Sequence, residues 1–211
     1  MSEIVQGSKE WHQARLGRVT ASCVADVVAK TKTGYSASRA NYMADLIAER
    51  LTGKPTEGFT NAAMQWGTDK EPEARIAYEF ERGVTVVQVG FVNHPRIDMT
   101  GASPDGLIGE DGLVEIKCPN TATHLETLLG APIAAKYVTQ MQWQMACAGR
   151  HWCDFASFDP RLPASMALHI RRVERDDAMI ADLEREVQKF LFEIEEKVSR
   201  LRASYGLSEA A

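Results

Sequence analysis

The stretch at residues 103–119 constrains the fold of this chain more than any other. It reads SPDGL, then a glycine- and acid-rich tetrapeptide at 109–112, then LVEIKCP. The tetrapeptide has the composition of a hairpin turn, and the apolar runs beside it are typical of strands. Such a hairpin brings Asp105 back toward the strand that carries Glu115 and Lys117. Because side chains alternate along a strand, Glu115 and Lys117 should share one face.

Two carboxylates and a lysine in this arrangement indicate a metal-dependent chemistry. Converging carboxylates repel one another unless a cation lies between them, and their oxygens suit Mg²⁺ or Mn²⁺. Bound Mg²⁺ also binds phosphate and activates water, so the pattern predicts cleavage of a phosphodiester. Lys117 could orient or deprotonate the attacking water, or balance charge on the phosphorus. The alternative is structural: Asp105 ends a turn, and Glu115 and Lys117 lie on a solvated strand face.

The remaining sequence predicts an alternation of helices and strands. Pro72 lies inside a long helical run at 61–82, where it predicts a kink or a junction of two helices. This order predicts one α/β or α+β domain over residues 1–211, with the helix at about 176–202 packing on the core or on a neighbouring subunit. Helices are predicted at 8–14, from Thr20 onward, from 36 or 38 to 51, at 61–82, 120–129, 133–148 and about 176–202, and strands at 84–92 with a break near Gly90, 99–107, 113–117, 152–158 and 166–173.

Composition places limits on the kind of protein. The chain has 211 residues, 45% of them hydrophobic, and no apolar run approaches the roughly 18 residues of a membrane span. The N-terminus shows no secretory signal, so its four cysteines are expected to be reduced. A net charge of −5 argues against a general nucleic-acid binder. However, residues 11–40 carry five basic groups and one acidic group, whereas residues 176–211 carry five basic and nine acidic groups, so one positive groove is still possible.

Several short motifs together resemble one known family. The resemblance is to the bacteriophage lambda exonuclease, or YqaJ-like viral recombinase, family of the PD-(D/E)xK nuclease superfamily. The motifs follow the family order and cover roughly residues 8–177. They are RLGxxTAS at Arg15–Ser22, WG at Trp66–Gly67 with Glu71 five residues after the tryptophan, SPDG at Ser103–Gly106, EIKCP at Glu115–Pro119, YxxQxQ at Tyr137–Gln142 and DPR at Asp159–Arg161.

The resemblance implies a restriction-endonuclease-like core, in which helices flank a central mixed β-sheet. It also implies specific roles for individual residues. Asp105 and Glu115 would be the main metal ligands, helped by the backbone carbonyl of Ile116. Glu71 would be a third acidic group near two Mg²⁺ ions, acting directly or through water, with Mn²⁺ as a substitute, and Lys117 would be catalytic. A pocket for a 5′-terminal phosphate would be lined by Arg15, Ser22, Ser103 and Gln140.

The family further implies a 5′→3′ exonuclease that acts on double-stranded DNA ends and leaves 3′ single-stranded tails for recombination. A ring-shaped homotrimer around the DNA, a phage single-strand annealing protein as partner and a phage or prophage gene expressed in the bacterial cytoplasm would follow. The alternatives are an endonuclease of the same fold and a non-catalytic protein that binds DNA ends. One departure is visible: the family arginine six residues after the catalytic lysine is replaced by Thr123. His124, Lys30, Lys32 or Arg39 are candidates to supply that positive charge.

Overall fold

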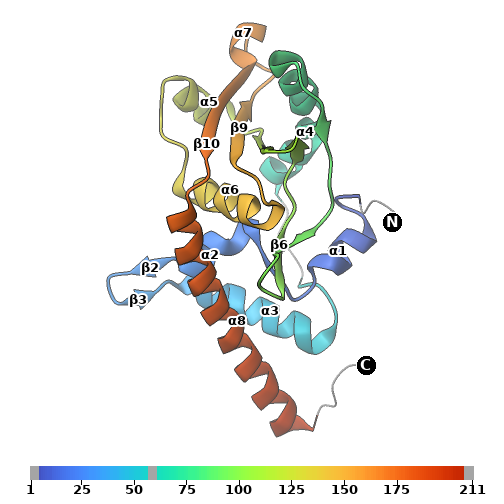
Figure 1. Cartoon of the computed structure of the whole chain (residues 1–211), viewed down its shortest axis with the longest axis vertical. Helices are drawn as coiled ribbons and strands as arrows, with labels where there is room; N and C mark the ends of the chain where they lie inside the picture. Colours follow the sequence, from blue (N-terminus) through green and yellow to red (C-terminus); the bar gives the residue numbers. More distant parts are fainter. Residues whose placement is uncertain (1–4, 57–60, 207–211) are drawn as a thin grey trace.

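A five-stranded mixed sheet forms the centre of the structure, a computed structural model that describes residues 5–56 and 61–206 (Figure 1). Its strand order is β10-β9-β8-β7-β4, in which β8 and β9 are parallel and the other neighbours are antiparallel. A mixed sheet flanked by helices confirms the predicted fold class. The strands are β4 (Val86–Val87), β7 (Gly106–Ile108), β8 (Gly112–Lys117), β9 (Trp152–Phe158) and β10 (Leu168–Glu174).

Two smaller sheets lie outside the central one. The first has the order β1-β6-β5, with β1 (Val19–Thr20), β6 (Thr100–Ala102) and β5 (Val92–Asn93). The second is a hairpin of β2 (Lys30–Thr31) and β3 (Gly34–Tyr35), which projects from the body in Figure 1. The predicted break near Gly90 is confirmed by β4 and β5. The single strand predicted at 99–107 is wrong, because β6 and β7 belong to different sheets and Pro104, which has no N–H to donate, lies between them.

Most helices begin and end where local signals predict. Asn61, Asn120 and Asp176 cap helix N-termini with their side chains, and Gly53 and Gly83 end helices in the left-handed conformation. The long helix runs through Pro72 without interruption, so a junction of two helices there is wrong. The helices are α1 (Lys9–Arg15), α2 (Val24–Val28) after a 3₁₀ turn at Ala21–Cys23, α3 (Ala37–Thr52), α4 (Ala62–Arg82), α5 (Thr121–Leu128), α6 (Ala135–Ala148), α7 (Ala164–Ala167) and α8 (Asp177–Tyr205). In the described ranges, no helix is both long and apolar enough to cross a membrane.

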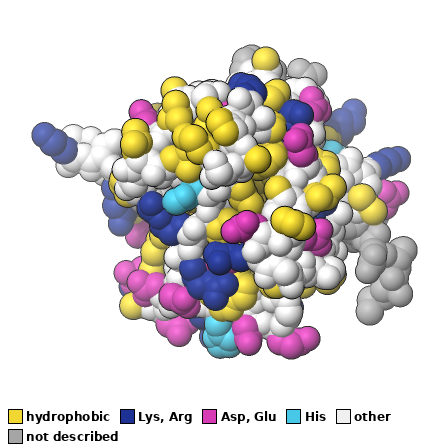
Figure 2. All heavy atoms as spheres, turned by 90° about the horizontal axis from the view of Figure 1, so that it is seen from above, with side chains coloured by type: hydrophobic (Ala, Val, Ile, Leu, Met, Phe, Trp, Pro, Cys, Tyr) yellow, Lys and Arg dark blue, Asp and Glu magenta, His cyan; other side chains and the backbone are white. Residues whose placement is uncertain are grey.

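The end of the molecule that carries α7 and the C-terminal end of α4 faces the viewer in Figure 2. Hydrophobic side chains gather over much of this face, and basic and acidic groups are interspersed among them. On α4, Ile76 and Phe80 are 68% and 89% exposed. One chain therefore does not present a continuous positive surface at this end.

Helices α4 and α6 cover opposite faces of the central sheet. Val114 and Ile116 of β8 belong to a buried cluster with α4, whereas Leu113 packs with α6. Because alternate strand residues point to opposite faces, Glu115 and Lys117 share the face of Leu113 and lie toward α6. The predicted common face of Glu115 and Lys117 is confirmed.

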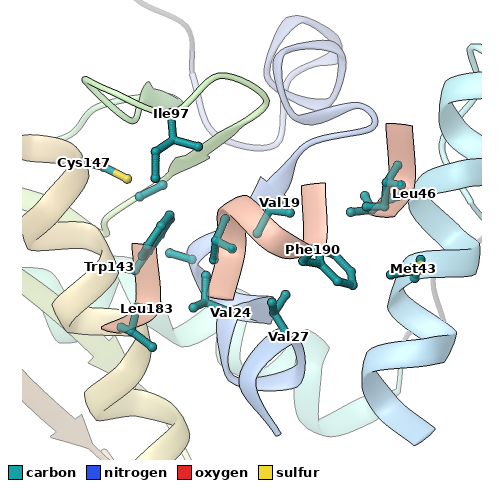
Figure 3. Close-up of a cluster of buried hydrophobic side chains, with 14 of the residues drawn as sticks. Val19, Val24, Val27, Met43, Leu46, Ile97, Trp143, Cys147, Leu183 and Phe190 are labelled. Atoms are coloured by element: carbon teal, nitrogen blue, oxygen red, sulfur yellow. The ribbon is translucent and has the colours of Figure 1, made fainter. Parts of the chain in front are cut away.

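The long C-terminal helix α8 packs on the core. Leu183 and Phe190 point into the cluster between α2, α3 and α6 (Figure 3). Burial of each such side chain contributes about 1.5–3 kcal/mol, so this stripe anchors α8 firmly. The fully buried positions of α8 are Ile180, Leu183, Val187, Phe190, Ile194 and Val198.

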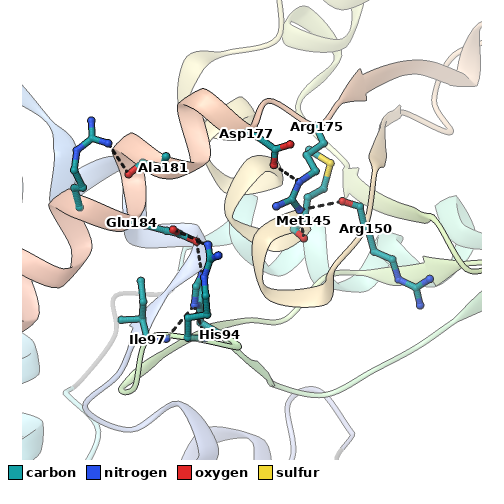
Figure 4. A network of polar contacts seen from close by, with 10 residues as sticks. His94, Ile97, Met145, Arg150, Arg175, Asp177, Ala181 and Glu184 are labelled. Atoms are coloured by element: carbon teal, nitrogen blue, oxygen red, sulfur yellow. Dashed lines mark hydrogen bonds and ion pairs between the residues drawn. The ribbon is translucent and has the colours of Figure 1, made fainter.

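Polar contacts fix the start of α8 to neighbouring segments (Figure 4). Glu184 binds Arg96 at 2.6 Å and lies 3.2 Å from Nε2 of the buried His94. Arg175 donates to the carbonyl of Met145 at 2.8 Å, at the C-terminal end of α6. The connection between β5 and β6, the helix α6 and the helix α8 are thereby held as one unit, which supports α6 behind the candidate site.

Candidate active site

The hairpin of β7 and β8 brings the first two candidate residues together. Its register ends at the pair Gly106–Val114, so Asp105 lies just beyond the last pair, next to the strand position of Glu115. Asp105 Oδ2 accepts a hydrogen bond of 2.7 Å from the backbone N–H of Ile116. The predicted hairpin and the return of Asp105 to the strand are therefore confirmed.

Glu115 is fully buried and surrounded by donors. The Nζ of Lys117 and the Nε2 of Gln140, at 2.7 Å, both donate to Glu115 Oε1. The Nε2 of Gln144 donates to Oε2 at 2.6 Å. The alternative of a solvated strand face is wrong for Glu115, whose side chain is 0% exposed. The three donors compensate the negative charge of the buried Glu115 carboxylate and fix its position.

Two carboxylates, Asp105 and Glu115, and the ammonium group of Lys117 lie close together, and this shifts the protonation of Asp105 and Lys117. Burial first, and then the charge of Glu115, raise the pKa of Asp105 well above its ordinary value. Burial alone would lower the pKa of Lys117, but Glu115 and Asp105 outweigh burial and raise it. This arrangement favours the charged form of Lys117, which donates to Glu115 and offsets its negative charge.

A cleft of about 580 Å³ opens beside this group, and the buried Glu115 lies behind its wall. Asp105, Ile116 and Lys117 form one wall, and Glu71 reaches the cleft from α4. Glu71 also pairs with Arg75 at 2.5 Å, so it is both a helix-surface ion pair and a cleft residue. Cys118 also lines the cleft, where burial, and then Glu71 and Asp105, raise the pKa of its thiol to about 12 and so favour the neutral thiol.

The donor set fits a hard divalent cation. Asp105, directly before β7, and Glu115 of β8 offer carboxylate oxygens, and Ile116 lines the cleft together with Asp105. Burial, and then the charge of Glu115, raise the pKa of Asp105, and a bound cation would favour its charged form. Over the described ranges, no three His, Cys, Asp or Glu side chains converge closely enough to form a complete metal cage. Mg²⁺ usually keeps several waters or phosphate oxygens and is held by one or two carboxylates.

Arg15 and Ser103 lie together on the N-terminal side of Asp105. Arg15 Nη1 donates to Ser103 Oγ at 3.4 Å, and the indole N–H of Trp11 donates to the same oxygen at 2.9 Å. The Arg15 guanidinium stacks over the Trp11 ring at 4.2 Å. No carboxylate in the described part of the chain forms an ion pair with Arg15. Burial lowers the pKa of Arg15, but a guanidinium stays charged, so this group can receive an anion.

The two other predicted phosphate-pocket residues make different contacts. The hydroxyl of Ser22 lies 3.3 Å from that of Thr20, on the turn before α2. Gln140 donates to Glu115, on the metal side of the site. In this structure, Gln140 and Ser22 therefore do not hydrogen-bond with the Arg15 and Ser103 pair.

Two candidates to replace the family arginine are wrong. His124 is fully buried, where its ring nitrogens contact Ser157 at 2.7 Å and the carbonyl of Met166 at 2.9 Å. Arg39 is 6% exposed and forms a two-pronged pair with Glu193 of α8. Both side chains are already bound by partners that lie far away in the sequence, and the local sequence does not reveal these partners. Thr123 itself lines the cleft.

The basic segment at 11–40 is also partly neutralised. Lys30 pairs with Glu186 of α8 at 2.9 Å, so it does not reach the cleft in this structure. Lys32 is exposed at the tip of the β2–β3 hairpin. Acidic residues of α8 thus form ion pairs with basic residues of the N-terminal segment and neutralise part of its positive charge.

Gln144 and Trp11 are site residues that the sequence analysis did not single out. Gln144 follows Gln140 by one helical turn within a helix whose other residues at 141–147 are buried. A glutamine inside such an apolar helical run is a signal for a buried partner. That partner, Glu115, is 29 positions away in the chain.

The mixed sheet and the grouped Asp105, Glu115 and Lys117 are those expected of a nuclease, and the comparison with known proteins agrees. The YqaJ-like viral recombinase domain model matches residues 10–151, so the chain belongs to this family. No curated protein matched the chain.

Two solved structures of one protein are similar to this chain in both sequence and fold. The chain is similar to LHK-Exo, an alkaline exonuclease from Laribacter hongkongensis, with 53% identity over 95% of this chain and 100% of that chain, and a TM-score of 0.88. The structure of LHK-Exo in complex with dAMP gives 54% identity over 94% and 98% of the two chains, and a TM-score of 0.88. A phage-related exonuclease from Haemophilus somnus 129PT, at 14% identity over 87% and 96% and a TM-score of 0.67, shares the fold. The predictions of this family and of a nuclease homologue are confirmed.

Proposed function

We propose that this chain is a Mg²⁺-dependent exonuclease that degrades one strand of duplex DNA from its 5′ end and leaves a 3′ single-stranded tail. The observation that carries the proposal is the juxtaposition of Asp105 with the buried Glu115 and with Lys117 at a cleft. The similarity to an alkaline exonuclease over nearly the whole of both chains supports it, as does the dAMP bound to that relative.

Asp105 and Glu115 would hold the metal, with the Ile116 carbonyl between them and Glu71 acting through water. When bound, Mg²⁺ or Mn²⁺ would supply an activated water and would neutralise phosphate charge, and a two-ion arrangement would steady both the attacking and the leaving oxygen. Lys117 lies beside Glu115 and would donate to a phosphate oxygen or orient the water. These groups would fix the phosphate within the cleft in line for hydrolysis.

The strand end would be held by a separate group. Arg15 offers a planar set of donors without an acidic partner in the described residues, and Ser103 adds a hydroxyl two residues before Asp105. A 5′-terminal phosphate bound there would lie close to the metal site. Gln140 and Ser22 would complete the pocket after a change of hydrogen-bond partners.

The assembly that we propose is a homotrimeric ring in the host-cell cytoplasm, with duplex DNA in its channel and a phage annealing protein as partner. Mixed charge on the face in Figure 2 and a net charge of −5 are compatible with a basic channel that forms only in the assembled ring. The whole chain would act as one nuclease domain.

The test is digestion of three matched duplexes with Mg²⁺ or with EDTA. Linear duplex with 5′ phosphates should be degraded fastest, linear duplex with 5′ hydroxyls more slowly, and closed circles not at all. Rapid loss of closed circles would favour an endonuclease of the same fold. Binding of ends without digestion would favour a non-catalytic end-binding protein, and digestion that survives EDTA would refute the metal site.

A further inference from the structure

Gln144 lies behind the site rather than in the cleft. Its side chain is 0% exposed, and it lies on α6 between Trp143 and Met145, which are also fully buried. Its Nε2 donates to Glu115 Oε2 at 2.6 Å. Since a carboxylate only accepts hydrogen bonds, the amide nitrogen must be the atom that faces Glu115.

The two oxygens of Glu115 have different partners. Oε2 is bound by the buried Gln144. Oε1 is bound by Lys117, whose side chain is 28% exposed, and by the partly buried Gln140. Lys117 and Gln140 are thus in part accessible to solvent, whereas Gln144 is fully enclosed by protein.

We infer that Gln144 is a positioning residue of the metal site, which holds Glu115 by Oε2 so that Oε1 stays directed at the cation. When the cation binds, the hydrogen bonds from Lys117 and Gln140 to Oε1 are the ones that give way to the metal–oxygen contact. This inference rests on the proposed metal-dependent function and adds the residue that orients the ligand. Groups that fix a ligating carboxylate from behind change metal affinity by about 10- to 100-fold.

The second half of the Gln144 amide supports a role beyond packing. Its Oε1 is buried and has no hydrogen-bond partner within the described residues. An unsatisfied buried carbonyl is destabilising, so an apolar side chain would suit this place better if only packing mattered. The bond to Glu115 is the compensating contact.

The experiment is calorimetric titration of the full chain with Mn²⁺ in the absence of DNA. Gln144→Met removes the donor with little change of volume, and it should raise the Mn²⁺ dissociation constant about 10- to 100-fold. The Mg²⁺ concentration for half-maximal digestion should rise in parallel, with the rate largely restored at saturating Mg²⁺. Gln144→Asn withdraws the amide by one methylene and should shift affinity in the same direction, which covers the case in which the methionine variant does not fold.

Gln142→Met is the matched control. Gln142 is also buried on α6, but it donates to the carbonyl of Glu174 and accepts from the N–H of Asp176. Its loss should lower the melting temperature without changing Mn²⁺ affinity. Wild-type affinity in a folded Gln144 variant, or an equal shift in Gln142→Met, would overturn the inference alone. A wild-type chain that binds no Mn²⁺ would overturn the proposed function as well.

Discussion

Replacing Asp105 by asparagine should stabilise the metal-free protein while abolishing cleavage. Directly opposite residues of neighbouring strands have Cβ atoms about 5 Å apart. Two unit charges at about that distance repel by about 3 kcal/mol at an effective dielectric constant near 20. Lys117, bound to Glu115, offsets part of this repulsion, so the net gain should be about 1–2 kcal/mol. Asparagine can still accept the hydrogen bond from Ile116 N–H.

The assay is urea and thermal unfolding in EDTA. A gain of that size should raise the melting temperature by about 2–8 °C for a chain of this length. The difference should shrink on acidification, because Asp105 has a raised pKa and becomes neutral at a higher pH than an ordinary aspartate. Added Mg²⁺ should stabilise the wild type more than Asp105→Asn, because it binds only an intact site.

Asp154→Asn is the matched control. Asp154 is also fully buried on the central sheet, but Tyr78 donates to it at 2.8 Å and Arg172 donates at 2.8 and 3.2 Å. Its charge is compensated, so the same substitution should cost about 2–4 kcal/mol. An Asp105→Asn protein that is less stable than the wild type in EDTA would refute the reasoning about crowded charge.

Three further predictions address separate parts of the account. Lys117→Ala should slow digestion by about 10²- to 10⁴-fold while DNA-end binding, measured by gel shift, persists; unchanged turnover would remove Lys117 from the mechanism. Arg15→Ala should reduce the ratio of rates on 5′-phosphate and 5′-hydroxyl ends by about 10-fold or more, and an equal ratio would refute the pocket. Burial alone would raise the pKa of Asp159, but hydrogen bonds from Arg161 and Thr121 lower it to about 2. The ionised Asp159 therefore stabilises the folded protein above about pH 4, and this stabilisation is lost as the pH falls toward 2. Urea titrations should show that Arg161→Met loses less stability than the wild type over this interval, by no more than about 2 kcal/mol, and equal losses would refute the pairing.

The sequence predicted the parts of the site that depend on short-range rules. The turn at 109–112 and the alternation along β8 place Asp105, Glu115 and Lys117, and both features are local. Helix ends were similarly accessible through Asn120 and Gly83, which cap or end helices by their own chemistry.

The errors at the site concern partners that lie far away in the chain, whereas the strand at 99–107 and the helix junction at Pro72 were local misassignments. Arg39 resembles a free basic residue until α8 returns Glu193 to it, 154 positions later. His124 resembles a surface group until β9 places Ser157 beside it. The apolar run around Gln144 indicates that it has a buried partner but does not identify Glu115, which lies 29 positions away in the chain.

The most direct test of the central claim follows each end of one strand during digestion. A linear duplex is labelled on the same strand, either at its 5′ terminus or at its 3′ terminus, and is incubated with Mg²⁺ and with either wild type or Glu115→Ala. A metal-dependent 5′→3′ exonuclease should release the 5′ label early as mononucleotide and leave the 3′ label on a shortening strand, and the variant should release neither. Earlier loss of the 3′ label, or activity of Glu115→Ala equal to wild type, would contradict this prediction.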